Sequence, residues 1–169
     1  MRIALGSDHR GYHVKERLKA FLAGLGHEVI DCGADSDASS DYPDFAIPAC
    51  LKVASQEAER SILMCGSGIG MTMVANKVAG IRAALCHDEL TAEMSRRHND
   101  ANILCLAADL LSDDLIRRMV EVWLVTPFEA GRHARRVEKV MQAERYLAKP
   151  GTADTVPVPC RPLKTPAKK

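Results

Sequence analysis

The feature of this sequence that most constrains its fold is the alternation of short apolar runs with segments of helical periodicity. Apolar side chains occupy both odd and even positions of each run, which is typical of parallel strands buried on both faces. Helical segments between successive runs would connect such strands as crossovers. The sequence therefore predicts one sheet of five parallel strands flanked by helices, with the strands at residues 2–5, 28–32, 61–65, 81–86 and 102–106.

Capping residues indicate where the helices begin and end. Apolar residues recur at helical spacing from Val14 to Leu25, and Gly26 is predicted to end this helix because glycine favours helix C-termini. Proline favours the first helical turn, so Pro43 is predicted to begin the next helix. Three further helix starts are predicted, at the N-cap residues Asp88 and Ser112 and after Gly131.

Size and charge limit the class of protein. The 169 residues are 47% apolar, with 23 basic and 22 acidic side chains, which suits one domain that folds without disulfides or metal. Nucleic-acid binders need clustered basic charge, which this balance argues against. No apolar run approaches the ~18 residues of a membrane span, and Gly6 interrupts the first run before a signal peptide could form. We expect a cytoplasmic protein that binds neither nucleic acid nor membranes.

The C-terminal segment differs in composition from the rest of the chain. Residues 149–169 contain five of the eight prolines and have no periodic apolar face. A segment of this kind cannot bury enough apolar surface to form a packed core. We therefore expect a folded domain at residues 1–148 and a Pro/Lys-rich flexible tail at residues 149–169.

The six cysteines are widely separated, at positions 32, 50, 65, 86, 105 and 160. Zinc sites and disulfide frameworks usually show closely spaced pairs such as C-x-x-C, and this chain has none. Several of the cysteines lie inside apolar runs. The pattern predicts reduced, mostly buried thiols and no metal site.

Two loops that follow predicted strands carry residues that could bind a ligand or take part in catalysis. In open parallel sheets, ligands bind beyond the carboxyl ends of the strands, where the segments Gly6–Gly11 and Cys65–Gly70 are expected. The three glycines of the second loop would let successive backbone N–H groups face one anion. The loop lacks the G-x-G-x-x-G and Walker patterns, and the nucleophile elbow needs glycine where Cys65 stands. Cys65 is either a base at this anion cradle or a buried structural thiol.

Further candidates lie in the C-terminal half. We expect His98 and Asn99 to reach the same carboxyl edge of the sheet on folding, although His98 alone could be a surface residue at a helix end. Arg132 and Arg136 are four residues apart, so they share one helical face and could converge on one phosphate. Each could equally belong to a solvated face.

The order of these motifs resembles the ribose-5-phosphate isomerase B family, with its galactose-6-phosphate and allose-6-phosphate isomerase relatives. The resemblance covers about residues 1–147 and implies a single-domain, Rossmann-like (flavodoxin-type) three-layer α/β/α fold. It also implies metal-free, cofactor-free interconversion of aldose and ketose phosphates in homodimers or tetramers, with active sites at the subunit interface. The matching segments are 6–12, 41–44, 65–70, 75–77, 80–83, 97–100, 131–133 and 136–137.

The resemblance also implies a role for each candidate residue. Cys65 would be the base that moves a proton between C1 and C2, and His98 would assist opening of the furanose ring. The developing enediolate would be held by Ser67 and by the backbone N–H groups of Gly66, Gly68, Ile69 and Gly70. Binding roles would fall to Asp8 and Asn99 for sugar hydroxyls, to His9, Arg132 and Arg136 for the phosphate, and to His133 and Tyr42 as supporting residues.

One departure from the family pattern bears on the substrate. Asp109 stands where many members place an arginine that contacts phosphate, and a lost charge-assisted contact costs on the order of 1.5 to 3 kcal/mol. Ribose 5-phosphate and ribulose 5-phosphate are the first expectation. A tetrose or tetrulose 4-phosphate such as D-erythrulose 4-phosphate, or an allose or galactose 6-phosphate, is the alternative. Outside this chemistry, a sugar-phosphate sensor and a nucleotide-binding protein are the competing interpretations.

Overall fold

The computed structural model describes residues 1–147, so the predicted tail at residues 149–169 lies outside the described part of the chain. The five predicted strands are confirmed as β1 (Arg2–Ser7), β2 (Glu28–Asp31), β3 (Arg60–Cys65), β4 (Ala83–Leu85) and β5 (Ile103–Ala107). The helices are α1 (Tyr12–Gly24), α2 (Pro43–Ala54), α3 (Ile69–Ala75), α4 (Glu89–Asn99), α5 (Asp113–Val125) and α6 (Arg132–Leu147).

All four strand pairings are parallel, and the strand order is β2-β1-β3-β5-β4. The central strand β3 pairs with β1 through Ala4 and Ser61 and with β5 through Met64 and Leu106. This order keeps the first three positions of the flavodoxin-like order 2-1-3-4-5 and exchanges the last two. The sheet is therefore the core of the predicted Rossmann-like fold.

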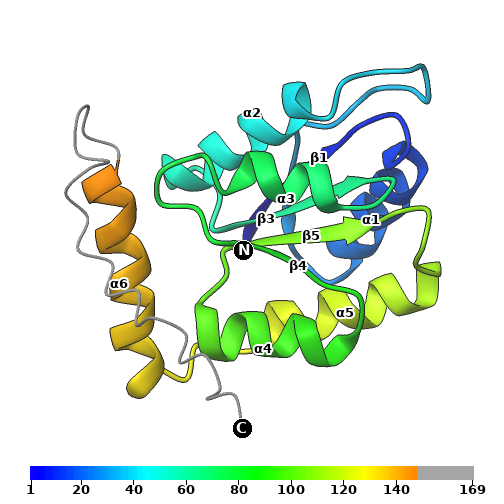
Figure 1. The fold of residues 1–169 in the computed structure, drawn as a ribbon. Coiled ribbons are helices and arrows are strands. Elements are labelled where there is room, and N and C mark those ends of the chain that lie inside the picture. Colours follow the sequence, from blue (N-terminus) through cyan, green and yellow to red (C-terminus); the bar gives the residue numbers. More distant parts are fainter. Residues whose placement is uncertain (148–169) are drawn as a thin grey trace, which may run out of the picture.

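Helices cover both faces of the sheet (Figure 1). On one face, apolar side chains of α1, α4 and α5, among them Leu22 and Trp123, pack against β1, β3 and β5. On the other face, α2 and α3 contribute Ala49 and Met71 to a second cluster that includes Cys65. The result is the predicted three-layer arrangement, with Cys65 at the end of a buried strand.

The predicted helix caps are also found. The Asp88 carboxylate accepts the Thr91 N–H at the start of α4, and the Ser112 hydroxyl accepts the Leu115 N–H at the start of α5. The predicted strand at residues 81–86 is shorter in the structure. At its start, the Arg82 N–H donates to the Asn102 side chain at 2.8 Å, although the Arg82 carbonyl oxygen still accepts the Asn102 N–H at 3.1 Å.

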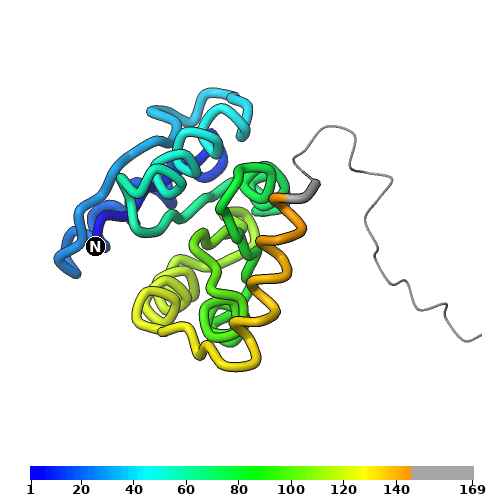
Figure 2. Tube along the Cα trace, turned by 90° about the vertical axis from the view of Figure 1, so that its left-hand side faces the viewer, coloured from blue at the N-terminus to red at the C-terminus, as the bar shows by residue number. Residues whose placement is uncertain are grey.

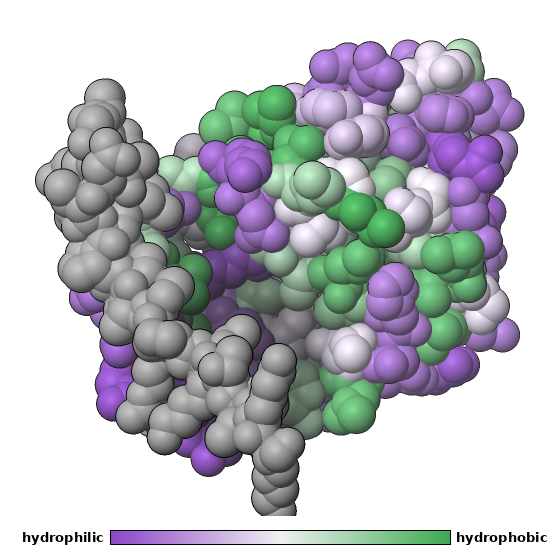
Figure 3. Space-filling view, viewed as in Figure 1, coloured by the Kyte–Doolittle hydropathy of each residue, from purple (hydrophilic) through white to green (hydrophobic). Residues whose placement is uncertain are grey.

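Helix α6 lies at the edge of the molecule beside α4 (Figures 1 and 2). The Glu144 carboxylate accepts the Gly80 N–H at 3.0 and 3.1 Å, which ties α6 to the loop before β4. A hollow remains between α6 and the rest of the chain (Figure 3). Within residues 1–147, no helix combines the length and the apolar character that crossing a membrane requires.

Candidate active site

The loops after β1, β3 and β5 meet at the carboxyl edge of the sheet. Because β3 lies between β1 and β5, the segment Cys65–Gly70 is flanked by Asp8–Gly11 on one side and by Asp109 on the other. The parallel sheet thus brings together two predicted loops that are more than fifty residues apart in the sequence. This edge holds the first half of the candidate site.

The Cys65 loop is folded around the sulfur atom. Cys65 is buried, and the Gly68 N–H donates to its Sγ at 3.2 Å. Gly68 has φ 72°, a left-handed conformation that favours glycine, and it caps α3 at Ile69. The Ser67 hydroxyl oxygen accepts the Ile69 N–H at 3.3 Å, which leaves its own hydrogen available for donation. The loop therefore places a thiol, a hydroxyl and backbone N–H donors at one helix start.

Cys65 is the candidate base because of its place in this loop, and the surroundings of the other thiols of residues 1–147 disfavour ionisation. Burial raises the pKa of Cys50 to about 12 and that of Cys86 to about 11. Burial also raises the pKa of Cys32 and of Cys105 above the usual range. These shifts disfavour the thiolate form of the four thiols, which is what we expect of structural cysteines.

The residues after β1 and those just before α2 complete this half of the site. Asp8 is buried, and its Oδ1 accepts the N–H groups of Arg10 and Gly11 at 2.9 and 3.1 Å. The His9 ring is held at Nδ1, which lies 3.1 Å from the Ser40 carbonyl oxygen and 3.2 Å from the Ser40 nitrogen. Tyr42 lies against the loop, since a Cβ atom on Gly70 would be 2.8 Å from the Tyr42 ring.

Sequence reasoning missed one feature of this edge, the ion pair between Arg10 and Asp109. Arg10 Nε lies 2.6 Å from Asp109 Oδ2, and this contact raises the pKa of Arg10. The sequence does contain a signal for this ion pair: Arg10 and Asp109 have opposite charges, and each follows a strand that pairs with β3. Asp109 therefore faces a cation of its own chain.

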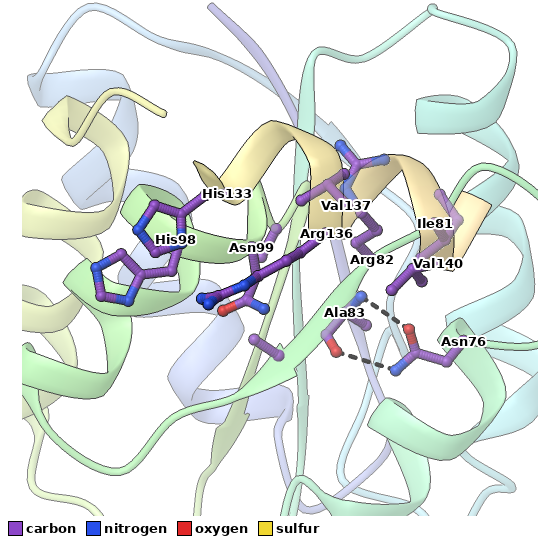
Figure 4. A pocket seen from close by; sticks show the side chains of 12 residues that line it. Asn76, Ile81, Arg82, Ala83, His98, Asn99, His133, Arg136, Val137 and Val140 are labelled. Carbon is purple, nitrogen blue, oxygen red and sulfur yellow. Dashed lines mark hydrogen bonds between the residues drawn. The ribbon is translucent and has the colours of Figure 1, made fainter. Parts of the chain in front are cut away.

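The second half of the site lies elsewhere. His98 and Asn99 end α4, His133 and Arg136 lie near the start of α6, and these four line a cavity of about 550 Å³ (Figure 4). The rings of His98 and His133 are stacked, with centroids 4.1 Å apart and planes 2° from parallel. Burial lowers the pKa of His133, and the neighbouring His98 and Arg132 lower it further.

The expectation that His98 reaches the carboxyl edge beside Cys65 is wrong for a single chain. Helix α4 crosses back from the carboxyl end of β4 to the amino end of β5, so its last residues lie at the opposite edge. The cavity next to His98 is accordingly lined by Arg82 and Ala83, which precede and begin β4. Crossover helices in parallel sheets always reverse direction in this way.

In this second half, the polar part of the cavity lining is positively charged, and Ile81, Val137 and Val140 form an apolar wall. Arg82 and Arg136 line the cavity with His98, while Glu129 is held by Arg97 at 3.2 Å. His98, Glu129 and His133 could in principle hold a metal ion, because one potential ligand atom of each residue lies within 4.8 Å of those of the other two. Stacked, parallel rings direct their nitrogen lone pairs side by side, which is a poor arrangement for one metal ion. The cavity is better suited to an anion.

Comparisons with known proteins show the family of this chain. The family model described as Ribose/Galactose Isomerase matches residues 3–140. Ribose-5-phosphate isomerase B of Escherichia coli (strain K12) is 41% identical over 144 residues, which cover 85% of this chain and 97% of that protein. The 4-deoxy-4-sulfo-D-erythrose isomerase of Clostridium sp. (strain MSTE9) is 40% identical over 148 residues, covering 87% and 93%.

Solved structures give the same result. The structure of Clostridium thermocellum ribose-5-phosphate isomerase B superposes with a TM-score of 0.86 at 46% identity, covering 88% of this chain and all of that one. Both the family match and these identities extend over the two halves of the site. The chain belongs to the ribose/galactose isomerase family and is a sugar-phosphate isomerase.

Proposed function

We propose that the protein interconverts ribose 5-phosphate and ribulose 5-phosphate through a cis-enediolate, without a metal or cofactor. The observation that carries the proposal is the Cys65 loop, where a thiol lies beside a hydroxyl and backbone N–H donors. Enediolate chemistry needs a base next to C1 and C2 and donors where the oxygen becomes negative. The loop supplies both kinds of group within six residues.

The proposed reaction begins from the open-chain aldose. The Cys65 thiolate removes the proton from C2, and the electron pair of that C–H bond forms the C1–C2 double bond while the O1 atom becomes negative. The Ser67 hydroxyl and the loop N–H groups stabilise this oxygen. The protonated thiol then returns the proton to C1, and the O2 proton moves to O1, which yields the ketose.

The remaining groups would bind and prepare the sugar phosphate. His98 would assist ring opening by exchanging a proton with the ring oxygen. Asp8 already uses Oδ1 for two backbone bonds, so Oδ2 is the atom we assign to a sugar hydroxyl. The proposed phosphate ligands are His9, Arg132 and Arg136, Asn99 would hold a hydroxyl, and His133 and Tyr42 would support these groups.

We also propose that the active site forms between two copies of the chain. The Cys65 loop and the His98 cavity lie at opposite edges of one sheet, so one substrate can meet both only if a second copy supplies one of them. An exposed apolar surface on α2 and α3, formed by Ile47, Leu51, Ile69 and Met73, supports such an assembly (Figure 3). A homodimer meets this requirement, and so does a tetramer built from such dimers.

A four-carbon substrate is the second candidate, and two observations favour it. One relative at 40% identity carries the name of an isomerase that acts on a sulfonated erythrose. In addition, Asp109 lies beside the loop and is paired with Arg10, so Asp109 adds no positive charge for a phosphate there. The chemistry at Cys65 would be the same for either chain length.

Proton NMR in D₂O with ribose 5-phosphate tests the proposal. The expected result is the appearance of ribulose 5-phosphate, together with deuterium at C2 of the recovered ribose 5-phosphate. Activity with erythrose 4-phosphate but not with ribose 5-phosphate would show that the protein acts on the four-carbon substrate instead. Binding of sugar phosphates without turnover of any of them would overturn the enzymatic proposal in favour of a sensor.

A further inference from the structure

The Arg10–Asp109 ion pair spans the carboxyl end of the central strand. Arg10 follows β1, Asp109 follows β5, and β3 lies between these two strands. A contact between the two residues must therefore pass over the end of β3, where Cys65 and Gly66 lie. The 2.6 Å distance between Arg10 Nε and Asp109 Oδ2 closes this bridge.

The pair lies directly against the start of the Cys65 loop. A Cβ atom on Gly66 would be 2.5 Å from Asp109 Oδ2 and 3.1 Å from Arg10 Nε, so the loop leaves no space between itself and the pair. Asp109 is also fixed by its backbone, because its N–H donates to the Gly66 carbonyl oxygen at 3.1 Å. The bridge is thus a fixed wall next to Gly66.

The pair is still accessible from outside. The side chain of Arg10 is 57% exposed and that of Asp109 is 34% exposed, so a ligand at the loop can contact both. The two charges compensate each other, which makes the wall neutral overall while it remains bulky. Such a neutral, bulky pair would select ligands by their size more than by their charge.

We propose that the Arg10–Asp109 bridge limits the length of the substrate, so that the site takes sugar phosphates of four or five carbons and rejects those of six. The inference rests on the proposed function, because C1 and C2 must lie at the Cys65 sulfur. With the reacting carbons fixed there, a wall at Gly66 restricts how far the rest of the sugar can extend. A poor fit of one methylene-sized group changes discrimination by about 10- to 200-fold.

The test measures binding of three stable analogues, 4-phosphoerythronate, 5-phosphoribonate and 6-phosphogluconate, by isothermal titration calorimetry. The variant Arg10→Ala/Asp109→Ala removes the wall, while Asp109→Asn keeps most of its bulk and changes its charge. A matched control is Arg118→Ala/Glu89→Ala, which removes another exposed ion pair with a 2.6 Å contact, away from the loop. Turnover of the corresponding aldose phosphates is measured in parallel.

In the wild-type protein we expect 6-phosphogluconate to bind at least about tenfold more weakly than the two shorter analogues. Arg10→Ala/Asp109→Ala should remove this difference, and Asp109→Asn and the control should keep it. An unchanged length preference in the double alanine variant would overturn the inference, as would equal binding of all three analogues by the wild type. Length-dependent binding without turnover would contradict the proposed function and leave the length limit intact.

Discussion

Cys65 differs from the other described cysteines in the surroundings of its sulfur atom. Its Sγ accepts an N–H from Gly68 at the start of a helix, whereas the sulfur atoms of Cys50 and Cys105 lie in apolar surroundings where burial raises their pKa. A general base contributes about 10²- to 10⁴-fold to a reaction rate. The role of Cys65 can therefore be tested at a single atom.

Replacing the sulfur by oxygen should abolish most turnover and leave binding intact. We expect Cys65→Ser to lower kcat by about 10²- to 10⁴-fold with little change in the Kd for ribose 5-phosphate. Cys32→Ser is the control, because Cys32 also follows a strand but is a structural thiol. Steady-state kinetics and calorimetry check both values, and a Cys65→Ser enzyme with near-normal kcat would remove Cys65 from the mechanism.

His98 should matter only for substrates that form a ring. Ribose 5-phosphate closes a furanose, but erythrose 4-phosphate cannot, because its terminal oxygen carries the phosphate. We expect His98→Ala to reduce kcat/KM for ribose 5-phosphate at least about tenfold more than for erythrose 4-phosphate. Equal losses for the two substrates would show that His98 acts in a step other than ring opening.

His133 should make stability depend on pH. Burial lowers its pKa below the ordinary value of 6.5, so the folded state disfavours the protonated ring. The contribution of the neutral ring is fully present above pH 6.5 and is lost as the pH falls through the lowered value. We expect the Tm to fall between pH 7 and pH 5, and to fall less in His133→Gln. Identical Tm profiles for the two proteins would contradict this assignment.

At the scale of elements, a side-chain contact of Glu144 helps to hold α6, which carries the second half of the candidate site. Glu144 accepts the Gly80 N–H, so the helix that carries Arg132 and Arg136 is fixed against the loop before β4. A hydrogen bond to a charged group contributes about 1.5 to 3 kcal/mol. Loss of the anchor should loosen the phosphate ligands without touching the base.

We therefore expect Glu144→Ala to raise KM for ribose 5-phosphate severalfold and to change kcat little. Glu138→Ala is the matched control, since Glu138 pairs with Arg145 on the exposed surface of the same helix. Steady-state kinetics on the two variants separate the effects. A fall in kcat alone, or equal effects of the two substitutions, would argue against an anchoring role.

Short sequence patterns predicted the strands and helices well, because apolar periodicity and capping bonds depend on residues that are close together in the sequence. The apolar runs that end at Cys65 and near Leu106 predicted buried parallel strands, and Asp88 predicted a helix start through its own capping bond. The motifs at the Cys65 loop likewise predicted which residues make up one half of the candidate site. What sequence spacing could not predict was how distant parts face one another.

Two features show this limit. The position of His98 depends on the direction of α4 relative to the sheet, and it lies at the edge opposite to the one expected. The Arg10–Asp109 contact joins residues 99 positions apart, and no local pattern links them. Both depend on the order in which the strands assemble rather than on the neighbouring sequence.

At the scale of the whole molecule, the proposed active site belongs to two chains. In the proposed mechanism the Cys65 loop and the cavity beside His98 would each hold part of the chemistry, and they lie at opposite edges of one sheet. Two inactive variants with defects in different halves should then complement each other. Within one heterodimer, one of the two sites would combine an intact Cys65 with an intact His98.

The most direct test mixes Cys65→Ala and His98→Ala after unfolding and refolding them together, with ribose 5-phosphate turnover as the measurement. Random association makes half of the dimers heterodimers with one intact site of two, so we predict recovery of about a quarter of the wild-type activity. Each variant refolded alone should stay far below this level. A refolded mixture that contains heterodimers and remains as inactive as the separate variants would contradict an active site shared between two chains.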